Sequence, residues 1–82
     1  MKITVKMFGR YKSIMGANTI EINITKGDTI WHVIDSLVKK YPRLEKEKKF
    51  ILVSHNQMYA TLETIIKDGD EITLSPPIVG GG

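Results

Sequence analysis

The sequence predicts an α+β fold in which one main helix packs across one face of a small mixed β-sheet. Apolar and polar residues alternate near both ends of the chain, as in strands with one buried face. Residues 30–41 instead carry apolar side chains at helical spacing. Eighty-two residues are enough for one domain. A single helix covers only one face of a sheet, so we expect the other face to be open.

The first two strands are predicted to form a hairpin. Residues 2–7 alternate with the apolar side chains inward, which places Phe8 on the outer face. Residues 10–15 are expected to make a short helical turn. Residues 19–24 alternate in the same way and predict the return strand.

The main helix has clear start and stop signals. Thr29 is a favourable N-cap, and apolar residues follow at i, i+3, i+4, i+7, i+8 and i+11 from Ile30. Pro42 is expected to end the helix, because proline disfavours a helical conformation in the residue before it. The charged run at residues 45–49 mixes lysines with glutamates and is interpreted as a solvated loop.

The second half of the chain predicts three further strands. Residues 50–54 read as a buried strand, followed by a turn at His55-Asn56 and a short strand at residues 58–60. Residues 67–70 form a turn signal. Residues 71–75 alternate again and predict the last strand, with its polar side chains outward.

The open sheet face is expected to carry a partner-binding surface. The strand alternation projects Phe8 and Tyr59 from this face, beside Ser75. Exposed aromatic side chains on an uncovered sheet indicate a protein interface. The alternative is that the two rings only support cross-strand pairing.

Composition excludes several kinds of chemistry. The chain has no cysteine, which excludes disulfides, thiolate zinc sites and a cysteine nucleophile. No phosphate-binding loop or metal-ligand spacing is present, and His32 and His55 are expected in surface or turn roles. We therefore expect no metal and no bound cofactor. No apolar run reaches membrane-spanning length, so a soluble cytoplasmic protein without a membrane partner is expected.

The net charge of +3 raises the question of nucleic acid. All but two of the twelve basic residues are lysines, Arg10 and Arg43 being the exceptions, and the charge is dispersed. Nucleic acid is therefore not the expected partner, and an RNA-binding module is the weaker alternative.

The C-terminal segment is the strongest functional signal. Pro76 and Pro77 stop a strand, and three glycines follow them. We expect residues 1–75 to form the folded domain and residues 76–82 a flexible tail, reaching about 23–25 Å beyond Ser75. Because glycine has no side chain, the three-glycine end of this tail can enter a narrow channel. The carboxylate of Gly82 is therefore the expected functional group. Because glycine is not chiral, its Cα cannot epimerise when this carboxylate is activated as an acyl-adenylate.

The chain resembles the MoaD/ThiS-like sulfur carriers, ubiquitin-like β-grasp proteins that include the small subunit of molybdopterin synthase. The resemblance covers nearly the whole chain. It rests on residues 7–10, 55–57 and 68–72, and most of all on the Pro-Pro-Ile-Val-Gly-Gly sequence at 76–81.

The resemblance implies a carrier that is not itself an enzyme. An E1-like, ATP-dependent enzyme would adenylate the terminal glycine, and sulfur transfer would give a thiocarboxylate. The tail, namely Pro76, Pro77, Ile78, Val79, Gly80 and Gly81, would then enter the active site of the large subunit of molybdopterin synthase, in a heterotetramer.

Two residues depart from the family pattern. The family usually ends at two glycines, so either Gly82 reacts or it is removed to expose Gly81. Ser75 stands where an apolar or aromatic residue usually precedes the prolines. Two alternatives stay open: a modifier joined to lysine side chains by isopeptide bonds, and a sulfur carrier for thiamine or cysteine synthesis.

Overall fold

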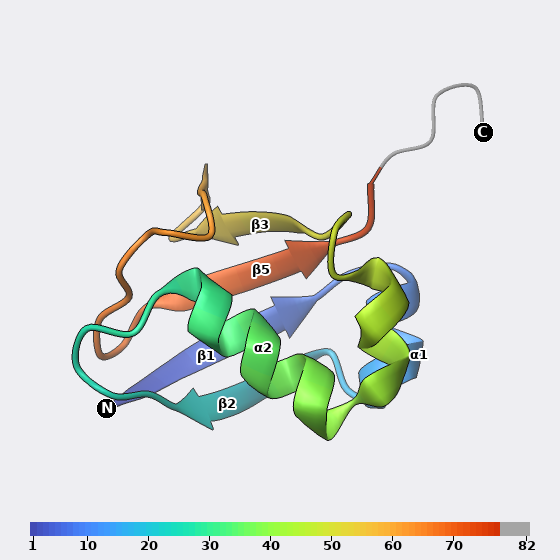
Figure 1. Cartoon of the computed structure of the whole chain (residues 1–82), viewed down its shortest axis with the longest axis horizontal. Coiled ribbons are helices and arrows are strands. Elements are labelled where there is room, and N and C mark those ends of the chain that lie inside the picture. Colours follow the sequence, from blue (N-terminus) through green and yellow to red (C-terminus); the bar gives the residue numbers. More distant parts are fainter. Residues whose placement is uncertain (78–82) are drawn as a thin grey trace.

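The fold is a five-stranded mixed sheet with one long helix across it (Figure 1). We describe residues 1–77 of a computed structural model of the chain. Its elements, in chain order, are β1 (Lys2–Met7), α1 (Arg10–Met15), β2 (Thr19–Asn23), α2 (Ile30–Lys40), the 3₁₀ helix η1 (Pro42–Glu47), β3 (Leu52–His55), β4 (Met58–Tyr59) and β5 (Glu71–Ser75). Within residues 1–77, no helix is long and apolar enough to cross a membrane. The predicted fold class is confirmed.

The two terminal strands lie side by side in the middle of the sheet. The strand order is β2-β1-β5-β3-β4. Strand β1 pairs antiparallel with β2 and parallel with β5, and β5 pairs antiparallel with β3. The arrowheads of β1 and β5 therefore lie at the same end of the sheet, beside α1 (Figure 1). The residues that follow these two strands consequently meet there.

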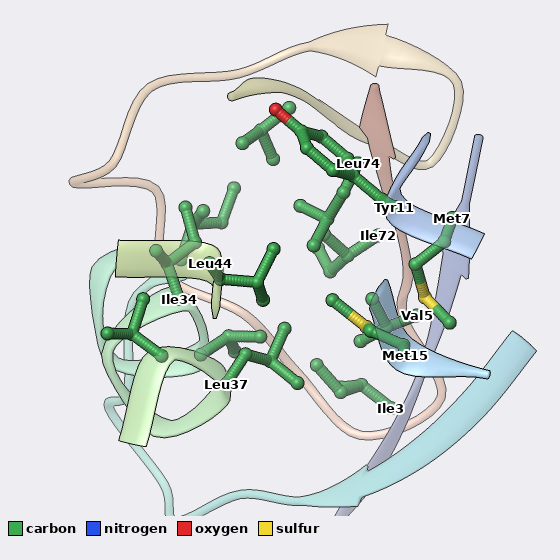
Figure 2. Packing of buried hydrophobic residues seen from close by; sticks show 14 of the residues in the cluster. Ile3, Val5, Met7, Tyr11, Met15, Ile34, Leu37, Leu44, Ile72 and Leu74 are labelled. Carbon is green, nitrogen blue, oxygen red and sulfur yellow. The ribbon is translucent and has the colours of Figure 1, made fainter. Parts of the chain in front are cut away.

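The core lies between α2 and the face of the sheet that it covers. The register places Val5 opposite Ile72, and Leu74 opposite both Met7 and Val53, so these side chains share one face. Burying such a side chain fully contributes about 1.5–3 kcal/mol. Figure 2 shows this apolar cluster. It comprises Ile3, Val5, Met7, Tyr11, Met15, Ile24, Ile30, Val33, Ile34, Leu37, Val38, Leu44, Val53, Ile66, Ile72 and Leu74.

The main helix begins and ends as predicted. Thr29 is the N-cap of α2, and its backbone N–H donates to Nδ1 of His32 at 3.0 Å. This hydrogen bond occupies a donor at the helix start and gives His32 a capping role. The helix ends at Lys40, two residues before Pro42.

The prediction of a buried strand from residue 50 was wrong. Strand β3 begins at Leu52, and the side chain of Phe50 is 57% exposed. Phe50 lies in the turn after η1, where its N–H donates to the carbonyl of Glu47. Only alternate residues of β3 can face α2, so Val53 is buried and Leu52 lies partly exposed on the open face.

The charged run at residues 45–49 is not simply a solvated loop. Its first half belongs to η1, which buries Leu44 completely against the core. Glu47 is held by Arg10 and Tyr11. The lysines of this run remain at the surface, while its backbone closes one end of the core.

The turn between β3 and β4 lies one residue later than predicted. His55 pairs with Met58 as the last residue of β3. Asn56 and Gln57 form the two-residue loop, with φ of 50° and 72°. Positive φ at both loop residues matches the right-handed twist of a hairpin.

Candidate functional site

A shallow groove lies on the open face of the sheet, where β5 ends. Its volume is about 390 Å³. The ends of β1 and β5 and the β3–β4 hairpin line it. The lining residues are Phe8, Leu52, Val53, Ser54, Gln57, Tyr59, Thr73, Ser75 and Pro76.

The two aromatic residues singled out in the sequence both line this groove, together with Ser75. Phe8 is 49% exposed and Tyr59 is 87% exposed. Phe8 directly follows β1 and Tyr59 belongs to β4, and β5 and β3 lie between these two strands, so the groove extends across β5 and β3. Nζ of Lys12 lies 5.8 Å from the centre of the Phe8 ring and adds a positive charge at this rim.

Leu52 and Gln57 also line the groove, although the sequence pattern did not indicate them. Reading residues 50–53 as a continuous buried run concealed the alternation that places Leu52 on the open face. A two-residue loop at Asn56-Gln57 would have placed Gln57 at the groove, but the pairing register that reveals this loop is a tertiary feature.

The C-terminal arm leaves the sheet at the rim of this groove. Leu52 pairs with Ser75 in the last step of the β3–β5 ladder. Pro76 follows, and without an N–H it cannot extend the ladder. Pro76 and Pro77 are half-buried against the domain. The other tail residues predicted to act, Ile78, Val79, Gly80, Gly81 and Gly82, lie outside the described residues.

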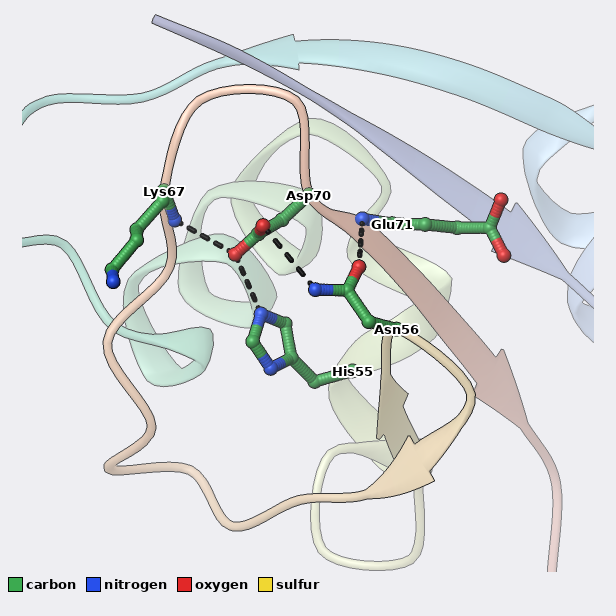
Figure 3. A network of polar contacts seen from close by, with 5 residues as sticks. All are labelled: His55, Asn56, Lys67, Asp70 and Glu71. Atoms are coloured by element: carbon green, nitrogen blue, oxygen red, sulfur yellow. Dashed lines mark hydrogen bonds and ion pairs between the residues drawn. The ribbon is translucent and has the colours of Figure 1, made fainter.

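A polar network fastens the β3–β4 hairpin to the start of β5 (Figure 3). Asp70 accepts hydrogen bonds from Nε2 of His55 at 2.5 Å, from the side-chain amide of Asn56 at 3.3 Å and from the backbone N–H of Lys67 at 2.9 Å. The N–H of Glu71 donates to Oδ1 of Asn56 at 2.9 Å. These hydrogen bonds therefore fix the hairpin that carries Tyr59 and Gln57 to the start of β5.

The network keeps Asp70 ionised. Partial burial raises the pKa of this carboxyl, but hydrogen bonds from His55, Lys67 and Asn56 together outweigh burial and lower the pKa below 3.8. His55 thus has a structural role at the end of β3, one residue before the turn in which the sequence placed it.

A second polar cluster holds the segment that follows Phe8. Nη2 of Arg10 lies 2.5 Å from Oε1 of Glu47, and the hydroxyl of Tyr11 donates to the same oxygen at 3.3 Å. The hydrogen bond from Arg10 lowers the pKa of Glu47 and raises that of Arg10. Burial, followed by the charge of Glu47, raises the pKa of Tyr11 to about 12. These bonds anchor α1 to η1 beside the groove.

The described residues form a groove at the base of the C-terminal arm. The buried side chains within residues 1–77 are all apolar apart from the Tyr11 hydroxyl. In this part of the chain no three His, Asp or Glu side chains gather as a metal site.

This architecture defines the class of protein as ubiquitin-like β-grasp. The chain superposes on SAMP1 from Haloferax volcanii with a TM-score of 0.86 and 26% identity, covering 99% of this chain and 100% of that one. It also superposes on one chain of the protein–protein complex of subunits 1 and 2 of molybdopterin-converting factor from Helicobacter pylori. There the TM-score is 0.71 at 24% identity, covering 99% and 100% of the two chains, which shows a shared fold.

The chain belongs to the ThiS family, whose model matches residues 5–81. It is 30% identical to the molybdopterin synthase sulfur carrier subunit of Mycobacterium tuberculosis, over 99% of both chains. The corresponding protein of Arabidopsis thaliana is 31% identical, over 99% of this chain and 84% of its own length. The predicted family is thus confirmed, and it classes the chain with sulfur carriers of the MoaD/ThiS type instead of with enzymes.

Proposed function

We propose that this protein carries sulfur for molybdenum cofactor biosynthesis as the small subunit of a molybdopterin synthase. The observation that supports this most directly is the extent of the family match, which runs through the C-terminal glycines to residue 81. The full-length relatives named as molybdopterin synthase sulfur carrier subunits support the same pathway.

The proposed chemistry takes place at the terminal carboxylate. An E1-like enzyme binds ATP and joins the carboxylate to AMP, releasing pyrophosphate. Hydrosulfide, or a donor equivalent to it, then attacks the carbonyl carbon. A C–S bond forms, the C–O bond to AMP breaks, and one proton is released. The product is a thiocarboxylate, and the carrier needs no bound cofactor for either step.

The groove on the open face would hold the large subunit while the arm reaches its active site. Phe8 and Tyr59 are exposed aromatic side chains beside Ser75, and such residues often provide most of an interface's binding energy. Pro76 and Pro77 would hold the start of the arm straight, and Ile78 and Val79 would guide it. The proposed assembly is a heterotetramer in the cytoplasm, with the activating enzyme as a second, successive partner.

Gly82 is the proposed working end of the arm. Removal of Gly82 to expose Gly81 would need a protease, and no feature of the chain calls for one. Residues from 76 onward would act as one extended thread of fixed length.

The likeness to SAMP1 favours a second candidate function, that of a protein modifier. The adenylated glycine would then be transferred to a lysine amine as an isopeptide. Sulfur carriage for thiamine or cysteine synthesis is a variant of the main proposal that uses the same thiocarboxylate. Cellular proteins that gain the mass of the whole chain would identify the modifier, whereas a free thiocarboxylate identifies the carrier.

Intact mass spectrometry tests the main proposal. The chain is incubated with its activating enzyme, ATP and sulfide, and we expect one oxygen to be replaced by sulfur. A chain truncated after Val79 serves as the control and should stay unmodified. An unchanged terminus on the full chain, with an enzyme shown to form the adenylate, would overturn the proposal.

A further inference from the structure

A close contact joins Gly9 to Pro76 at the base of the arm. A Cβ atom built on Gly9 would lie 2.8 Å from Cγ and 3.2 Å from Cδ of the Pro76 ring. Real Cβ atoms essentially never come within 3.0 Å of another heavy atom. Gly9 also has φ 59° and ψ −139°, a conformation that residues with a Cβ rarely adopt. The absence of a side chain at Gly9 therefore lets Pro76 lie where it does.

This proximity distinguishes Gly9 from the other described glycines. Gly16, Gly27 and Gly69 also have positive φ, but nothing lies within 4 Å of a Cβ built on any of them. The positive φ at these three positions is enough to explain why each is a glycine. At Gly9 the neighbouring ring of the arm adds a second requirement.

The pairing of β1 with β5 brings the two residues together. Met7 is opposite Leu74, and the N–H of Phe8 donates to the carbonyl of Leu74 at 3.0 Å. Gly9 and Pro76 each lie two residues beyond the Met7–Leu74 pair, just after the ends of the parallel strands β1 and β5. The ring of Pro76 fixes its own φ, so it has little freedom to turn away from Gly9.

We infer that Gly9 is a positioning residue for the C-terminal arm. Its bare Cα is the surface against which the Pro76 ring rests, and this contact fixes the direction in which the arm leaves the sheet. The consequence for sulfur transfer rests on the proposed function. The contact itself does not.

A side chain at position 9 would redirect the arm. Ordinary contact begins at 3.4 Å, so a Cβ at Gly9 would displace the Pro76 ring by at least about 0.6 Å. Pro77 follows directly and is equally stiff, so the displacement would be passed along the arm. Misplacing a reacting atom by 1 Å can slow a reaction on the order of a hundredfold.

Distance measurements between two spin labels test the positioning without any sulfur chemistry. The chain has no cysteine, so Glu63→Cys and Val79→Cys give two specific labelling sites. We expect Gly9→Ala to shift or broaden the distribution of distances between the labels. Gly16→Ala, which adds the same methyl group at positive φ in open space, should leave it unchanged. Identical distributions for the parent chain and Gly9→Ala would overturn the inference.

Pro76→Ala provides a variant that does not depend on the folding of Gly9→Ala. It removes the ring atoms nearest Gly9 and frees φ at position 76, so the label distances should broaden. If Pro76→Ala gives the same distribution as the parent chain, the ring does not set the direction of the arm.

Single-turnover sulfur transfer tests the functional consequence at a temperature where all variants are folded. Gly9→Ala should slow transfer by about 10–100-fold without weakening partner binding, and Gly16→Ala by less than about twofold. Equal losses in Gly9→Ala and Gly16→Ala would overturn the role in transfer. If the parent chain accepts no sulfur, the proposed function fails, and the label distances alone decide the positioning.

Discussion

Nε2 of His55 lies 2.5 Å from Oδ2 of Asp70, which ties the end of β3 to the residue just before β5. The same carboxylate receives the Asn56 amide and the Lys67 N–H. The Asp70 side chain thus joins the β3–β4 hairpin, which lines the groove, to the turn before β5, the strand that leads into the arm. The stability of this corner depends on the ionisation of Asp70.

Asp70→Asn should destabilise the protein at neutral pH by about 1–3 kcal/mol, because the hydrogen bonds to a charged acceptor are lost. The pKa of Asp70 is lower in the folded chain than its ordinary value of 3.8. Its stabilising contribution is therefore present above about pH 3.8 and is lost as the pH falls through the lower folded pKa. Urea unfolding across this range should show the variant and the parent converging in acid.

Asp35→Asn is the matched control for Asp70→Asn. Asp35 pairs with Lys39 at 3.1 Å on the surface of α2, where such a pair contributes about 0.3–0.5 kcal/mol. Its removal should change the free energy of unfolding by no more than that amount at any pH. Parallel pH profiles for Asp70→Asn and the parent chain would contradict the assigned role of Asp70.

Tyr11→Phe should make the protein more resistant to alkali. Burial and Glu47 raise the pKa of Tyr11 from 10.0 to about 12, so the folded state disfavours the phenolate. The stability that depends on the neutral hydroxyl is complete below about pH 10 and is lost as the pH rises towards 12. Unfolding measured from pH 9 to 12 should show a smaller loss in the variant than in the parent chain.

At neutral pH the Tyr11→Phe variant should lose only about 0.5–1.5 kcal/mol, the contribution of one hydrogen bond. The ring still fills the core between α1 and the sheet. Absorbance titration of the parent chain should show a tyrosine ionising near pH 12 that is missing from the variant. A titration curve unchanged by the substitution would mean that Tyr11 is not the shifted group.

The elements that could be predicted from sequence are those whose pattern is set by one packed face. Strand β1 and helix α2 repeat their apolar residues with the periods of a strand and a helix, and each buries the predicted side. The placement of Phe8 on the outer face follows from the same period. These assignments did not require knowing which residues contact one another in the folded chain.

The features that the sequence did not reveal depend on tertiary contacts. Phe50 and Leu52 are apolar but exposed, because β3 contacts the core only through alternate residues and begins after η1. The role of Glu47 depends on Arg10, thirty-seven residues away in sequence. The closeness of Gly9 and Pro76 depends on the parallel pairing of the first and last strands. No local pattern encodes a contact of that kind.

Phe8→Ala and Tyr59→Ala should each weaken binding of the large subunit by about 1–3 kcal/mol, because both remove an exposed ring that lines the groove. Calorimetric titration with the purified large subunit measures the loss. Thermal unfolding should change little, since neither ring belongs to the buried core.

Phe50→Ala is the control for the groove variants. Phe50 is as exposed as Phe8 but lines a separate surface with Trp31 and Leu62. Its substitution should leave affinity for the large subunit unchanged. If Phe50→Ala weakens binding and the groove variants do not, the partner docks on the helix side of the sheet.

The length of the arm should matter more than its composition. One residue moves the reacting carbon by up to about 3.5 Å, and misplacement by 1 Å can cost on the order of a hundredfold in rate. With Gly82 as the working end, deletion of Gly82 should nearly abolish single-turnover transfer while partner affinity stays the same. Unfolding should also be unaffected, because the core cluster of the described residues extends no further than Leu74. Chains ending at Gly80, Gly81 and Gly82 are compared with one activating enzyme and one large subunit. Faster transfer from the chain ending at Gly81 would make Gly81 the working end and predict trimming in the cell, and equal rates for all three would refute selection for length.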